Sequence, residues 1–107
     1  MSAEDKRYRA WVHTQDCCGH GLPDWTGDVH WCAGDEPVDQ SHERDHTGMS
    51  LKSGERRSVM KCRSLHLRYE AEHVRARDWM RERIAEFSAR FDREQAAVSA
   101  KERTQNG

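Results

Sequence analysis

The chain has 107 residues and a formal net charge of −1, from 18 basic and 19 acidic residues. Only thirteen residues are Leu, Ile, Val or Phe, which is below the ~20% at which composition begins to suggest disorder. Disorder usually also brings a high net charge, which this chain lacks. We therefore expect one small domain in which a metal, a partner chain or a disordered tail makes up for a poor core.

The apolar residues also bear on the location of the protein. No apolar run approaches the ~18 residues that span a bilayer. The first six residues, Met-Ser-Ala-Glu-Asp-Lys, contain no signal-peptide core. We therefore expect a soluble, cytoplasmic protein that makes no membrane contact.

Charge divides the chain into an acidic and a basic half. Residues 1–50 contain four basic and ten acidic residues, whereas residues 51–107 contain fourteen and nine. Five of the seven His and three of the four Cys lie in the acidic half. From the length of the chain we expect one domain over residues 1–103 and a disordered tail at 104–107. We divide the domain into a metal-binding head (14–54), a basic strand region (55–68) and an amphipathic helix (69–103).

In chain order, the first predicted element is a short strand at 7–13, where Tyr8, Ala10 and Val12 alternate with other residues. Residues 16–54 show no sustained period, and they contain most of the Gly and both Pro. Such a long loop is implausible in a compact domain unless something fixes it. Residues 57–67 alternate again, which predicts two strands or one bent strand.

The C-terminal segment is predicted to be one helix from about residue 70 to about 102. It contains no Gly or Pro, the residues that break helices, and it is rich in Ala, Arg, Glu and Gln, which favour helix. Spacings of 4, 3, 4 and 7 define an apolar heptad seam, consisting of Met80, Ile84, Phe87, Phe91 and Val98. We expect the seam to cover a small sheet or to form a helical dimer. Its first four members are the candidate protein-interaction residues.

Nine Cys and His residues lie at short spacings between residues 17 and 66. Thiolates and imidazoles are the ligands that tetrahedral zinc prefers. The predicted set is Cys18, Cys32, His42 and His46, because His42-x3-His46 matches the second half of a Cys2His2 site. The alternates are Cys17, His30, Cys62 and His66. A structural zinc contributes roughly 10 kcal/mol or more of apparent binding free energy, enough to decide whether residues 16–54 fold. The alternative is a set of surface His and unligated thiols.

Residues 42–46, His-Glu-Arg-Asp-His, also match the His-Glu-x-x-His motif of zinc proteases. In those enzymes two His bind zinc and the Glu activates water. That chemistry requires the motif on one face of a buried helix, and the intervening Arg and Asp provide no apolar face. We therefore predict a protein that is not an enzyme and retain a metallohydrolase as a third hypothesis.

Part of the head resembles a known family. The segments Pro-Asp-Trp-Thr-Gly-Asp-Val-His at 23–30 and Asp-His-Thr-Gly at 45–48 are similar to an uncharacterised family of short actinobacterial and actinophage proteins. The signature of that family is Cys-Pro-x-Trp-Cys-x3-His, followed by a later His, a few strands and an Ala/Glu-rich C-terminal helix. The resemblance implies this architecture and a phage origin, and it implies no activity. Three residues match the signature: Pro23, Trp25 and His30.

This chain departs from the family at both motif cysteines, which are Leu22 and Thr26 here. If the resemblance holds, other thiols of the head take those positions, and the candidates are Cys17, Cys18 and Cys32.

Five cations lie within residues 56–68, which contain no acid. In a strand, Arg57, Lys61 and Arg63 would share one face that could contact phosphates. The alternatives are a strand edge guarded by charge, or a surface that pairs with the acidic head of the same chain. The candidate nucleic-acid-binding residues are Arg56, Arg57, Lys61, Arg63 and Arg68.

These patterns predict the α+β class, with a loop-rich head stabilised by zinc, two or three short strands and a long amphipathic C-terminal helix. The predicted function is a zinc-binding regulatory or protein-interaction module that binds another protein through its helix or its acidic head. A homodimer is the alternative assembly. A nucleic-acid-binding accessory protein is the second functional hypothesis, and the metallohydrolase is the third.

Overall fold

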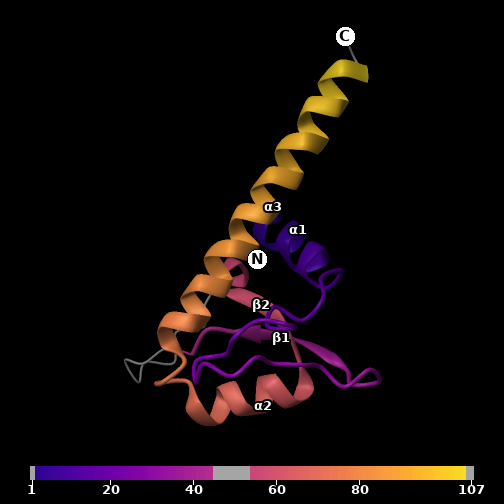
Figure 1. Cartoon of the computed structure of the whole chain (residues 1–107). Coiled ribbons are helices and arrows are strands. Elements are labelled where there is room, and N and C mark those ends of the chain that lie inside the picture. The colour runs from indigo at the N-terminus through magenta and orange to yellow at the C-terminus, as the bar shows by residue number, and fades with distance from the viewer. Residues whose placement is uncertain (1, 45–53, 106–107) are drawn as a thin grey trace.

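The computed structural model describes residues 2–44 and 54–105. Within these residues it contains three α-helices and a two-stranded antiparallel sheet, so the predicted α+β class is confirmed. The long C-terminal helix rises away from the rest of the chain, and the sheet, the loops and a second helix gather around its first half (Figure 1). None of the described helices is long and apolar enough to cross a bilayer.

The N-terminal segment is helix α1 (Ala3–Val12), so the predicted strand there is wrong. Ser2 caps the helix by accepting a hydrogen bond from the Asp5 N–H at 3.0 Å, which satisfies one of the free donors of the first turn. Tyr8 and Val12 are both fully buried. They are four residues apart, a spacing that fits one face of a helix as well as one face of a strand. The alternation was therefore ambiguous, and the cap is the feature that marks a helix.

The sheet joins one predicted strand to one that was not predicted. Strand β1 (Val38–His42) lies in the segment without periodicity and pairs with β2 (Ser58–Cys62), with Gln40 opposite Met60. All five residues of β2 are buried. The N–H of Cys18 donates to the Met60 carbonyl at 2.8 Å. This bond holds the segment after α1 against β2. Because β2 also pairs with β1, it lies at the centre of the small fold.

The region predicted as the end of a strand and one helix contains two helices. Helix α2 (Arg63–Glu72) begins directly after β2, and a turn at 73–76 separates it from α3 (Arg77–Gln105). Leu65 and Tyr69 are fully buried and four residues apart, so they form the inner face of α2. In a strand that ended at residue 67, Leu65 and its alternate neighbours would have faced inward, and Tyr69 would have lain beyond the end of the element.

The heptad seam of α3 is covered by the chain itself. Its first four residues are at most 8% exposed, and they pack with residues of α1 and β2. The Phe91 ring meets the Tyr8 ring edge-on, with 5.2 Å between centroids. Burial of each such side chain contributes about 1.5–3 kcal/mol. Val98 is 50% exposed, and the end of α3 extends beyond the core (Figure 1). The structure thus buries the four residues that were predicted to bind another protein: Met80, Ile84, Phe87 and Phe91.

Candidate metal centre

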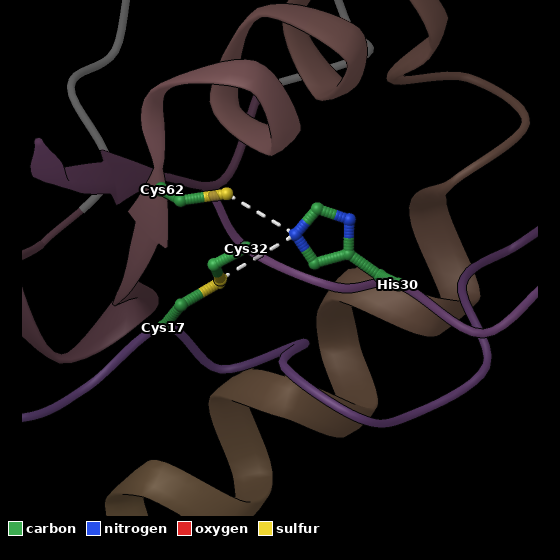
Figure 2. Close-up of side chains that lie close together, drawn as sticks. All are labelled: Cys17, His30, Cys32 and Cys62. Carbon is green, nitrogen blue, oxygen red and sulfur yellow. Dashed lines mark hydrogen bonds between the residues drawn. The ribbon is translucent and has the colours of Figure 1, made fainter. Parts of the chain in front are cut away.

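Four side chains from three segments of the chain converge on one point. Each offers one ligand atom, and all four atoms lie within 4.8 Å of one another; the residues are Cys17, His30, Cys32 and Cys62. Figure 2 shows the thiols of Cys32 and Cys62 directed toward the same ring nitrogen of His30. From His30 Nε2, the Sγ of Cys62 is 3.1 Å away and that of Cys32 is 3.6 Å away. Neighbouring ligands of a tetrahedral zinc are roughly 3.5–3.8 Å apart, given its bond lengths. This Cys3His group is therefore close to the size that one ion requires.

The sheet positions two of the thiols. Cys62 is the last residue of β2 and precedes the first turn of α2. The hydrogen bond from the Cys18 N–H to β2 places Cys17, one residue earlier, beside Cys62. A turn begins here, in which the His20 N–H donates to the Cys17 carbonyl at 3.4 Å. Cys17 joins the group, whereas Cys18 faces the hydrophobic core.

A tight hairpin over residues 20–32 supplies the other two ligands. The Gly21 N–H donates to the His30 carbonyl at 2.7 Å, and the His30 N–H donates to the Leu22 carbonyl at 2.9 Å. Gly21 has a φ of +73°, a left-handed conformation that favours glycine. His30 and Cys32 are two residues apart, so extended chain directs both side chains to the same side. His20 Nδ1 accepts the Cys32 N–H at 3.2 Å and steadies the end of the hairpin.

Burial sets the protonation of the group. It raises the pKa values of the Cys32 and Cys62 thiols, and it lowers the pKa of the His30 imidazole. Zinc binds thiolate and neutral imidazole. An incoming ion therefore finds His30 already in its binding form and must displace the protons of the two thiols.

The Cys3His group contains Cys32 from the predicted set and three of the four alternates. Cys18 lies in the hydrophobic core, where burial raises its pKa to about 12. His42 lies on β1, and its Nε2 is 3.6 Å from a carboxylate oxygen of Glu55. His46 lies outside the described residues. Of the eight predicted ligands and alternates, the structure brings together Cys17, His30, Cys32 and Cys62.

The remaining alternate, His66, lies on α2 between two acids. Its Nδ1 is 3.4 Å from Asp39 and its Nε2 is 3.3 Å from Glu70. A sequence signal for the observed group did exist, because His30-x-Cys32 places two ligands on one side of an extended segment. In the sequence alone, the finger-like spacing of His42 and His46 outweighs this signal.

The described part of the His-Glu-x-x-His segment, residues 42–44, is extended rather than helical. His42 ends β1, and the Glu43 N–H donates to the Arg57 carbonyl at 2.9 Å. The Glu43 carboxylate receives hydrogen bonds from Arg57 Nη2 at 2.6 and 2.7 Å. In the zinc-protease arrangement the Glu would instead activate a water molecule from a helix.

The five cations predicted to contact nucleic acid are each engaged within the chain. Lys61 is fully buried, its Nζ donates to Ser41 Oγ at 2.8 Å, and burial lowers its pKa to about 8. Arg63 begins α2 rather than continuing β2, so the expected shared face with Arg57 and Lys61 is wrong. The four arginines pair with acids, mostly of the head: Arg56 with Glu4 and Asp92, Arg57 with Glu43, Arg63 with Asp39, and Arg68 with Asp24. These contacts agree with the alternative of a surface that pairs with the acidic head.

Comparison with protein-family models, with curated proteins and with solved structures finds no match for this chain. The resemblance to short actinobacterial and actinophage proteins therefore stays a prediction. Its three matching residues have structural roles here. His30 belongs to the Cys3His group, Pro23 forms a bridge with Val29, and the Trp25 ring packs edge-on against Trp79.

Proposed function

We propose that the protein is a small zinc-binding module in which one ion, held by the Cys3His group, fixes the fold of the head. The observation that carries this proposal is the convergence of four ligand atoms within 4.8 Å. Hard cations such as Mg²⁺ and Ca²⁺ prefer oxygen ligands. Three thiolates and one imidazole instead suit zinc and other soft or borderline metals.

The ligand count favours a structural ion over a catalytic one. Catalytic zinc sites use three protein ligands and keep the fourth position for water or substrate. Here four side chains converge, so the protein fills a tetrahedron. His30 and Cys62 are both buried, which limits access from their side. We therefore propose a protein that is not an enzyme and that acts as a regulatory or interaction module.

Cobalt substitution tests the metal proposal. One equivalent of Co²⁺ should give the full chain a thiolate-to-cobalt charge-transfer band and the intense d–d bands of tetrahedral coordination. Cys17→Ser should weaken the charge-transfer band, because one of three thiolates is lost. Cys18→Ser is the matched control and should keep the wild-type spectrum, since Cys18 faces the core.

Two results would overturn the proposal. One is a wild-type chain that gives no tetrahedral thiolate spectrum. The other is a spectrum that depends on Cys18 and not on Cys17.

A further inference from the structure

The hairpin over residues 20–32 carries three exposed large apolar side chains. Trp31 is 68% exposed, Val29 is 47% exposed and Leu22 is 39% exposed. A single exposed apolar residue is ordinary, but these three share one short hairpin, whose arms meet at the bridge between Pro23 and Val29. An apolar cluster with a polar rim is typical of a protein-binding surface.

Trp31 lies in the chain between the two ligands of the hairpin. Because successive side chains of an extended segment alternate, His30 and Cys32 point to the metal group and Trp31 points away from it. The Trp31 ring packs edge-on against His20, with 5.4 Å between centroids. It also covers Gly21, where an added Cβ would lie 3.6 Å from the ring. The indole is thus held in place before any partner arrives, and this reduces the entropy lost on binding.

The segment that carries this surface is acidic, and Arg68 of α2 reaches it at Asp24 and Trp25. From residue 10 to residue 43 the chain contains seven acids and no Lys or Arg. Asp24, Asp39 and Glu43 pair with arginines of the basic half. By contrast, Asp28 and Asp35 are exposed and form no ion pair with another described residue. They lie three residues before and four residues after Trp31 in the chain, so two exposed carboxylates flank the indole in sequence.

We propose that this hairpin is the docking surface for an arginine-rich segment of another protein. A guanidinium group stacks on indole through cation–π attraction, and neighbouring arginines pair with Asp28 and Asp35. The same acids repel the phosphates of a nucleic acid. This inference rests on the proposed function, because an ion bound by His30 and Cys32 fixes the segment that presents Trp31.

The test uses the full chain loaded with zinc and a nine-residue peptide of alternating arginine and glycine, followed by isothermal titration calorimetry. The wild type should bind the peptide, and added salt should weaken the binding. A matched peptide with the neutral isostere citrulline in place of arginine should not bind. Trp31→Ala should weaken binding about tenfold, while its cobalt spectrum stays that of the wild type.

A charge-matched pair of double variants separates a site from general attraction. Asp28→Asn/Asp35→Asn should weaken binding severalfold. Asp78→Asn/Glu102→Gln removes the same number of charges from exposed positions on α3 and should leave binding unchanged.

Three outcomes would overturn the inference: unchanged binding by Trp31→Ala, equal losses in the two double variants, or a wild-type dimer that Trp31→Ala dissociates. The dimer would show that a second copy of the chain covers the surface. Failure of the metal proposal is recognised separately, by a wild-type chain that gives no tetrahedral cobalt spectrum.

Discussion

The thiols of the Cys3His group carry protons that a metal ion must displace. Burial raises the pKa values of Cys32 and Cys62, so both thiols stay protonated above the pH at which an ordinary Cys ionises. Each then releases one proton on metal binding, and metal affinity rises with pH until these thiols ionise by themselves.

This predicts a proton count that can be measured. At pH 7, well below the ordinary pKa of Cys, a thiol is protonated whether the head is folded or open. Binding by three thiolates should therefore release about three protons. Calorimetric titration of zinc into the metal-free chain, in buffers of different ionisation enthalpy, gives the count. A value of about two or lower would contradict a group of three thiolate ligands.

The neighbours Cys17 and Cys18 show what the sequence could and could not predict at the scale of a residue. The sequence predicted a metal bound by Cys and His within the head, and it left both cysteines as candidates. The choice between them depends on which side of the chain faces β2. A hydrogen bond to Met60, more than forty residues away, decides it, and no local pattern contains that contact.

At the scale of the element, long and strongly patterned segments were predicted better than short ones. The apolar seam of α3 repeats over several helical turns, and its residues between 80 and 91 form one side of the core. In α1 the alternation covers only Tyr8, Ala10 and Val12, and the two of these that are buried, Tyr8 and Val12, fit one face of a helix equally well. Strand β1 has no apolar alternation in its sequence, and it becomes part of the fold through its pairing with β2.

The cap of α1 provides a prediction for this element. Ser2→Ala removes the side-chain acceptor of the Asp5 N–H and should lower the free energy of unfolding by about 1 kcal/mol. Ser2→Gly is the comparison, because glycine at an N-cap costs only a few tenths of a kcal/mol relative to serine. Urea denaturation followed by circular dichroism measures both. Equal stability of Ser2→Ala and the wild type would contradict the cap.

The seam provides a second prediction, from two positions on the same helix. Phe87 is 2% exposed and Val98 is 50% exposed. Phe87→Ala should cost about 3–5 kcal/mol, because it leaves a cavity in the core. Val98→Ala should change the free energy of unfolding by less than about 0.5 kcal/mol, as surface substitutions do. A cost below about 0.5 kcal/mol for Phe87→Ala would show that the seam does not pack on this chain.

At the scale of the whole molecule, two separate halves of opposite charge fold onto each other. Arginines of the basic half reach acids of the head over long sequence distances, such as Arg57 to Glu43 and Arg68 to Asp24. The arginine of each pair is exposed, but the carboxylate is buried, at 9% exposure for Glu43 and 2% for Asp24. Each arginine therefore compensates a buried charge that would be costly to leave unpaired. The separation of charge was visible in the sequence, but the individual pairs depend on the fold.

The apolar core is the other property of the whole molecule. It lies along α1, β2 and the first half of α3, and the hairpin over residues 20–32 lies at its margin with three exposed apolar side chains. Trp25 of the hairpin packs against the core, and Trp79 Nε1 donates to the Pro23 carbonyl at 3.0 Å. A structural metal contributes roughly 10 kcal/mol or more, several times the ~1.5–3 kcal/mol of one fully buried apolar side chain.

Hydrogen exchange with and without a zinc chelator tests this account most directly. In the zinc-loaded chain, amides of residues 17–32 and of the α3 segment 80–91 should both be protected, and removal of the metal should abolish protection of residues 17–32 first. Elemental analysis before and after chelation confirms that one zinc per chain is lost. Unchanged protection of residues 17–32 after the loss of a stoichiometric zinc would contradict the claim that the metal holds the head together.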